Sequence, residues 1–200
     1  MAGKTEFNVT MALSDKIPVL FVDSATIQKA ENAIKGTKTL GVTTPSVAIP
    51  VPAVEWQETP DTAKKTSTLA ITKVSVAVSI TATVMIDKAI AKTSECFKHV
   101  NEHEKLHLQA YRDGATGHTA AIKRAVVDKT APQLKAPVQV ATKDVAKFKE
   151  RQQQRIVEAL DNAVVEALKE IKEASLAIHT DAERQKTNKI CAAYLPAKKP

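Results

Sequence analysis

The chain has 200 residues, of which 44% are hydrophobic and only five are glycine. This composition excludes a disordered or collagen-like chain and suits a domain with a buried core. The net charge of +7 comes from basic residues interspersed with acidic ones. Because no nucleic-acid-binding module or group of stacking aromatics accompanies them, the charge pattern argues against a nucleic-acid partner.

The N-terminal sequence MAGKTEFNVTMAL alternates polar and apolar residues and lacks the continuous apolar core of a signal peptide. No segment approaches the roughly 20 apolar residues of a membrane span. We therefore expect a soluble protein with no membrane contact, located in the cytoplasm or within an assembly such as a virion. Cys96 and Cys191 lie far apart without paired metal spacing, which leaves open whether they are free or disulfide-bonded.

Residues 1–36 are expected to form two strands and a short helix. Apolar and polar side chains alternate from Phe7 to Leu13, the period of a half-buried strand. The apolar run Val19–Val22 predicts a second strand, and Asp23 and Ser24 offer N-caps for the helix that follows.

Residues 37–66 are rich in threonine and proline. This composition predicts an extended arm or loop. The apolar residues between the prolines indicate that the arm packs against another surface, so we expect it to contribute to oligomer contacts. Its prolines are Pro45, Pro50, Pro52 and Pro60.

The clearest predicted strand spans residues 74–86, where apolar and polar residues alternate without interruption. Leu69 and Ile71 are out of phase with that series, so we expect a β-bulge or turn near Thr72. The apolar series consists of Val74, Val76, Val78, Ile80, Ala82, Val84 and Ile86.

Helical patterns fill the rest of the chain. Thr93 or Ser94 can cap a helix that ends at Gly114, and a second helix is predicted over residues 119–129. One long helix is predicted for residues 141–192, with apolar residues in heptad spacing that suits packing on a sheet or pairing with another helix, including one of a second subunit. The heptad residues are Val157, Leu160, Val164, Ala167, Ile171, Ala174 and Ile178.

The first of these helices contains the sequence His103-Glu104-Lys105-Leu106-His107. Two histidines four residues apart on a helix point to the same side, so both imidazoles can bind one metal ion. Glu104 is offset around the helix and can take a proton from a water that the ion activates. We predict His103 and His107 as zinc ligands and Glu104 as the general base.

A catalytic zinc site normally has three protein ligands. We predict His179 as the third ligand, because packing of the C-terminal helix could bring it opposite the motif, and His118 is the alternative. Glu183, four residues after His179, could approach from the same side. His99 lies one turn before His103, so the sequence also leaves open that pair, or a histidine-rich helix face without metal.

The segment SECFKHVNEHEKLHLQAY, together with its place between a β-rich part and long helices, resembles a bacterial zincin-like family of predicted secreted zinc-dependent proteases. The resemblance covers roughly residues 69–188. It implies a zincin-like domain over residues 67–195, zinc as the cofactor and a protein or peptide as the substrate. The segment from His179 to Arg184 keeps Asp181 of the family's late motif but lacks its His-Gly ending, a departure that points to an altered site.

From the order of elements we predict an α+β fold, in which an N-terminal antiparallel β-sheet precedes the HExxH helix and a long C-terminal helix. The predicted function is that of a zincin-like zinc metallopeptidase, active or degenerate. The alternative is a non-catalytic structural protein of a phage virion or secretion machine that retains this fold. That alternative rests on the proline-rich arm and the heptad residues, through which we expect a homo- or hetero-oligomer.

Overall fold

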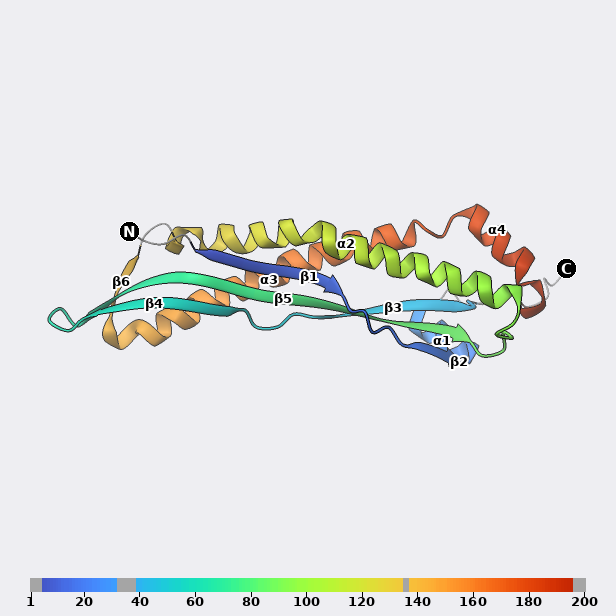
Figure 1. Ribbon diagram of the computed structural model, residues 1–200, viewed down its shortest axis with the longest axis horizontal. Helices are drawn as coiled ribbons and strands as arrows, with labels where there is room; N and C mark the ends of the chain where they lie inside the picture. The colour runs from blue at the N-terminus through green and yellow to red at the C-terminus, as the bar shows by residue number, and fades with distance from the viewer. Residues whose placement is uncertain (1–4, 32–38, 135–136, 196–200) are drawn as a thin grey trace. The chain divides into compact units, whose positions relative to one another are not determined.

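The computed structural model describes residues 5–31, 39–134 and 137–195. In these residues, six strands form one sheet and four α-helices accompany it (Figure 1). The strands are β1 (Glu6–Leu13), β2 (Val19–Val22), β3 (Gly41–Ala48), β4 (Ala53–Asp61), β5 (Thr66–Asp87) and β6 (Val138–Ala141). The helices are α1 (Ser24–Glu31), α2 (Glu95–Leu134), α3 (Val145–Leu176) and α4 (Asp181–Ile190).

The chain divides into two compact units, each built from three separate segments. Unit 1 contains Met1–Ala12, Ala48–Ser79 and Ala115–Lys169, and unit 2 contains Leu13–Val47, Ile80–Gly114 and Glu170–Pro200. The elements β5, α2 and α3 each contribute residues to both units. Neither unit coincides with a continuous range expected from the sequence.

The sheet is organised around β5, which pairs with every other described strand. Strands β4 and β6 both run antiparallel to its first residues, so they lie on opposite edges of it. Strand β2 is parallel to Val84–Asp87. The expectation of an antiparallel sheet was therefore right for β4 and β6 and wrong for β2. The chain between β2 and β5 contains α1, β3 and β4, which is long enough for the crossover that parallel pairing requires.

Strand β5 has the predicted alternation and the predicted bulge. Opposite it, β4 pairs Glu55 with Lys73 but Trp56 with Ile71, which leaves Thr72 as the extra residue. The extra residue returns Ile71 to the same face as the series that begins at Val74, and both side chains are buried.

Within residues 37–66, the expected arm or loop is replaced by strands β3 and β4, while residues 37 and 38 lie outside the described part. Both strands pair with β5 alone among the described strands, and an edge strand tolerates proline because one side of its backbone has no ladder partner. In unit 1, the Trp56 ring of β4 lies edge-on to Phe148 of α3, with 6.1 Å between centroids. The proline content thus marks edge strands rather than an unpaired arm.

Helix α2 continues through Gly114, where the sequence predicted its end, and includes the residues of the second predicted helix. A Cβ atom at position 114 would lie 2.4 Å from Cγ1 of Ile171 in α3. The glycine therefore permits close approach of the two helices in unit 2 and is not a helix terminator.

A long C-terminal helix is present, but the predicted range of residues 141–192 contains a strand end, α3 and α4 rather than one helix. The break between α3 and α4 is stabilised by Thr180, whose hydroxyl accepts a hydrogen bond from the backbone N–H of Glu183. Most heptad residues are buried within the chain, although Ala174 is exposed. The four fully buried ones are Leu160, Val164, Ala167 and Ile171.

The core of unit 2 joins strand β5 to the start of α2. It contains a disulfide between Cys96 and Cys191, whose Cα atoms are 4.8 Å apart. This bond decides a question that the cysteine spacing left open, and among the described residues no cysteine is free. The buried residues that form this core are Leu40, Val84, Ile86, Ile90, Cys96, Val100 and Cys191. No helix in the described ranges combines the length and the apolar composition needed to cross a membrane.

Candidate metal centre

Unit 2 brings together the three histidines that the sequence predicted as ligands. His103 and His107 lie one turn apart on α2, and His179 lies in the short segment between α3 and α4. One nitrogen from each ring lies within 4.8 Å of the corresponding atoms of the other two. Helix α3 would have carried His179 onward along its own axis, so the break after Leu176 places this residue beside the motif.

The spacing of the first two rings suits a shared ion. Their Nε2 atoms are 3.1 Å apart. Two nitrogens bound to a tetrahedral zinc ion at the usual bond length would be about 3.4 Å apart. The two rings therefore need only a small movement to bind a common ion, and His179 closes the third side with ring centroids 5.0 Å from His103 and 4.8 Å from His107.

The orientation of His107 is supported by a buried hydroxyl. Its Nδ1 atom lies 2.8 Å from Oγ of Ser175 in α3. Burial raises the pKa of Tyr111, one turn further along α2, and Ser175 acts in the opposite direction. When the Ser175 hydroxyl accepts a hydrogen bond from Nδ1–H of His107, the lone pair of Nε2 faces the other two histidines, as a metal ligand requires.

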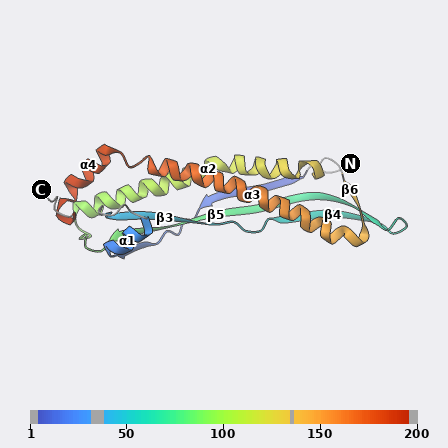
Figure 2. The same cartoon turned by 180° about the vertical axis from the view of Figure 1, so that it is seen from behind.

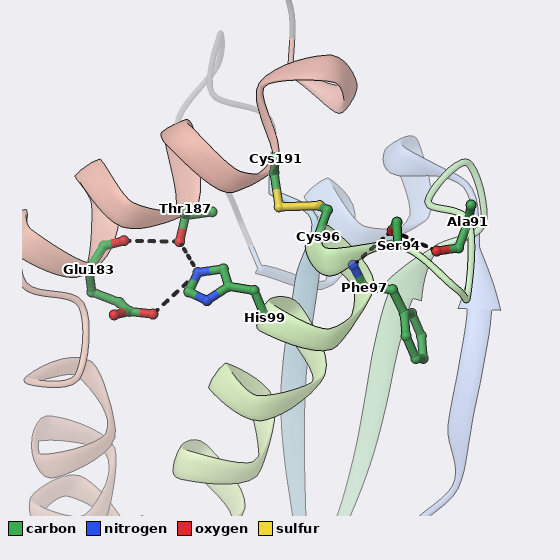
Figure 3. Close-up of a disulfide and its surroundings, with 8 residues drawn as sticks. All are labelled: Ala91, Ser94, Cys96, Phe97, His99, Glu183, Thr187 and Cys191. Atoms are coloured by element: carbon green, nitrogen blue, oxygen red, sulfur yellow. Dashed lines mark hydrogen bonds and ion pairs between the residues drawn. A yellow bond between two sulfur atoms is a disulfide. The ribbon is translucent and has the colours of Figure 1, made fainter.

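The second nitrogen of His103 faces a carboxylate. Nδ1 of His103 and Nε2 of His99 each lie 3.4 Å from Oε1 of Glu183 in α4. His99 Nε2 is also 2.7 Å from Oγ1 of Thr187 (Figure 3). Two of the three candidate ligands therefore have a polar group at the nitrogen that points away from the proposed ion.

The electrostatic environment favours neutral histidines. Burial, and then the proximity of His103 and His179, lowers the pKa of His107 to about 4. Burial also lowers the pKa of His103, although Glu183 acts in the opposite direction. A neutral imidazole is the form that binds a metal ion. Because both pKa values are lowered, protonation of these two residues hardly opposes metal binding at neutral pH.

Glu104 is buried between α2 and β3. Its Oε2 atom accepts a 2.7 Å hydrogen bond from the Thr43 hydroxyl of β3. A Cβ atom at Gly41 would lie 2.8 Å from Oε1 of Glu104 and 2.6 Å from Val100. The start of β3 therefore supplies both a hydrogen bond and the space that this carboxylate occupies.

His118, the predicted alternative ligand, is not a member of this group. It lies on the same helix as His107, eleven residues further on, but it belongs to unit 1, whereas the three histidines belong to unit 2. Helix α2 continues past Gly114, so a ligand role for His118 stays a prediction that this group of histidines does not support. His99 does not belong to the group either, and its Nε2 atom faces Thr187 and Glu183 of α4.

The sequence did not predict the contacts of Thr43 with Glu104 and of Ser175 with His107, and it indicated Glu183 only as a residue that could approach the site beside His179. Two signals were present. Thr180-Asp181-Ala182-Glu183 matches a capping box and could have predicted the helix break beside His179. Ser175 lies one turn after the apolar residue Ile171, and a polar residue on an apolar helix face indicates a hydrogen-bond partner.

Comparison of the chain with protein-family models, with curated proteins and with solved structures yields no match in any of the three.

Proposed function

We propose that this chain is a zincin-like zinc hydrolase in which His103, His107 and His179 bind one zinc ion. The observation that carries the proposal is the convergence of the three ring nitrogens within 4.8 Å. Histidines that lie close together by chance would not need a polar partner at the ring nitrogen that points away from the group. Here Ser175 and Glu183 face those nitrogens on His107 and His103.

The donor set fits a catalytic zinc ion. Three imidazoles suit zinc among the common metal ions, and three protein ligands leave the fourth position of a tetrahedral ion free for water or substrate. His179 is exposed to solvent, so the site is accessible from the side of the α3–α4 connection. A structural zinc site would normally have four protein ligands.

A zinc ion held by His103, His107 and His179 would supply two kinds of chemistry, a lower pKa for a bound water (about 7) and polarisation of a carbonyl group. Glu104 is the residue that we assign as the general base. The Thr43 hydroxyl holds its carboxylate, which limits the orientations available for accepting a proton. We infer a peptide bond as the substrate bond from the resemblance of the HEKLH helix to zinc proteases.

The disulfide bears on where such an enzyme would act. Disulfides form and persist mainly in oxidising compartments. The Cys96–Cys191 bond therefore favours a location outside the reducing cytoplasm, in contrast to the cytoplasmic expectation from the N-terminal sequence. A secreted or surface assembly is compatible with the bond.

We place the structural-protein alternative second. The proline-rich residues that suggested it form strands β3 and β4 of the chain's own sheet. The central heptad residues of α3 are buried within the chain. Both features are used internally, so neither requires an external partner.

Metal analysis and a peptidase assay test the proposal together. We expect about one zinc ion per chain after purification and removal of excess metal, and loss of that zinc in His103→Ala/His107→Ala. Glu104→Gln should retain zinc but lose peptidase activity, because it removes the base and no ligand. Absence of bound zinc in the unmodified protein after zinc is supplied would overturn the proposal.

A catalytically inactive zinc site would give a different result. The unmodified protein and Glu104→Gln would then bind zinc equally, and neither would cleave a mixture of unfolded protein substrates. That outcome would support a degenerate zincin-like site and return weight to a structural role.

A further inference from the structure

Helix α4 is held against α2 almost without apolar packing. None of its residues Asp181–Ile190 is buried. In both views of unit 2, α4 lies beside the first turns of α2 (Figures 1 and 2). Three described contacts connect the two helices, namely the disulfide that follows α4, the Thr187–His99 hydrogen bond, and the approach of Glu183 to His99 and His103.

The Glu183 carboxylate can contact the histidines because the backbone N–H that it would bond in a helix cap already has another acceptor. In a capping box, a glutamate at this position bonds to the backbone N–H of the N-cap residue. Here the N–H of Thr180 donates to the carbonyl of Ile178, and the Glu183 carboxylate turns towards α2 instead (Figure 3).

His103 Nδ1 needs such a partner. It is a buried nitrogen, and within the described part of the chain no group forms a hydrogen bond with it. The polar atom that faces it is Oε1 of Glu183, 3.4 Å away. A small closure of α4 onto α2 would bring this pair to hydrogen-bonding distance. His99 does not need Glu183 as a hydrogen-bond partner, because its Nε2 atom already lies 2.7 Å from Oγ1 of Thr187.

We propose that Glu183 is a positioning residue of the candidate zinc site, which holds the proton of His103 on Nδ1 and thereby directs the Nε2 lone pair towards the ion, and that the Cys96–Cys191 disulfide maintains this contact. The inference rests on the proposed function, because it assumes that the three histidines bind zinc. Carboxylates in this role fix both the tautomer and the orientation of a ligating histidine.

The disulfide is part of the proposal because of its place in the chain. Cys191 directly follows α4, and Cys96 lies two turns before His103 on α2. The bond therefore fixes one end of α4 to the helix that carries the motif. His179 lies just before the other end of α4. Release of the bond is expected to loosen both Glu183 and His179.

The test is a zinc-affinity measurement by competition with a chromophoric chelator, using the full chain. We expect Glu183→Ala to bind zinc about 10- to 100-fold more weakly than the unmodified protein, the usual effect of losing such a partner. Glu183→Gln should lose less, because its amide oxygen can still accept a hydrogen bond from Nδ1–H of His103.

Asp181→Asn is the matched control for charge. It removes a negative charge from the same helix, where Asp181 forms an exposed ion pair with Arg184, and it should leave the affinity within about twofold. Equal losses in all three variants would show that charge alone matters and would overturn the positioning role. Glu183→Ala with unchanged affinity would overturn it as well.

Cys96→Ala/Cys191→Ala tests the role of the disulfide. We expect weaker zinc binding together with faster amide hydrogen exchange in α4 of the zinc-free protein. Unchanged amide hydrogen exchange in α4 together with unchanged zinc affinity would overturn the proposed role of the disulfide. The failure of the proposed function is distinguishable from all these outcomes, because in that case the unmodified protein itself binds no zinc.

Discussion

The His107 side chain is only 6% exposed, and its pKa is lowered from 6.5 to about 4 by burial and by the neighbouring His103 and His179. In the unfolded chain this histidine titrates near its ordinary pKa, so between about pH 6.5 and 4 the unfolded state binds more protons than the folded state. Protonation then favours unfolding. For the zinc-free protein, we expect the contribution of His107 to stability to be complete above about pH 6.5 and to be lost as the pH falls towards 4.

The difference between the two pKa values corresponds to about 3 kcal/mol of unfolding free energy. Urea unfolding at several pH values in the presence of a chelator measures it. His107→Gln cannot take up this proton and should show a weaker pH dependence over the same range. Parallel pH profiles for the two proteins would contradict the prediction.

Ser175 is predicted to support His107 and not merely to fill space. Ser175→Ala removes the partner of a buried Nδ1 atom, which should cost about 1–3 kcal/mol of stability and about tenfold in zinc affinity. Chemical denaturation and chelator competition measure the two effects. Ser79→Ala, at an exposed position of β5, should change neither quantity. A Ser175→Ala protein with normal stability and affinity would contradict the assigned role.

At the scale of elements, the two glycines of α2 are predicted to respond oppositely to alanine. Alanine favours a helix by about 1 kcal/mol over glycine. At Gly117 the added Cβ would meet nothing within 4 Å beyond the adjacent backbone of α2 itself, so Gly117→Ala should stabilise the protein. At Gly114 the Cβ would meet Cγ1 of Ile171 at 2.4 Å, and the resulting repacking of α3 should produce a net loss of about 1–3 kcal/mol.

Denaturant unfolding of both glycine variants provides the comparison, with each serving as the control of the other. A stabilised Gly114→Ala would show that α2 and α3 are not in close contact at this point.

For the whole molecule, the disulfide is expected to contribute a large share of the stability. Cys96 and Cys191 are 95 residues apart. In the chain-entropy model, a crosslink over about 100 residues restricts the unfolded chain and raises its free energy by about 4.7 kcal/mol at 25 °C. Removal of a native disulfide typically costs about 2–5 kcal/mol. Thermal and urea unfolding of Cys96→Ala/Cys191→Ala measures this loss.

Zinc should restore part of that stability if the site survives, because a ligand that binds only the folded state adds about 2.7 kcal/mol at 100 times its dissociation constant. A Cys96→Ala/Cys191→Ala protein as stable as the unmodified one would show that the crosslink does not constrain the unfolded chain. Equal melting temperatures with zinc and with chelator would show that no folded-state zinc site forms.

The sequence by itself determined the features that depend on near neighbours along the chain. The strand over β5 and its bulge at Thr72 follow from apolar residues at a spacing of two and from the change of phase after Ile71. The pairing of His103 with His107 follows from the pitch of one helix. In each case a few consecutive residues contain the whole physical cause, so no knowledge of distant contacts was required.

The tertiary structure decided the features that depend on residues far apart. From the sequence, Gly114 indicates a helix end, whereas in the structure it permits the close approach of Ile171. The prolines of β3 and β4 indicate an unpaired arm, whereas in the structure these strands pair with β5. The choice of His179 over His118, and the contacts of Ser175 and Glu183, depend on how α3 and α4 return to α2. Such packing depends on many weak contacts between distant segments, and no local period in the sequence encodes it.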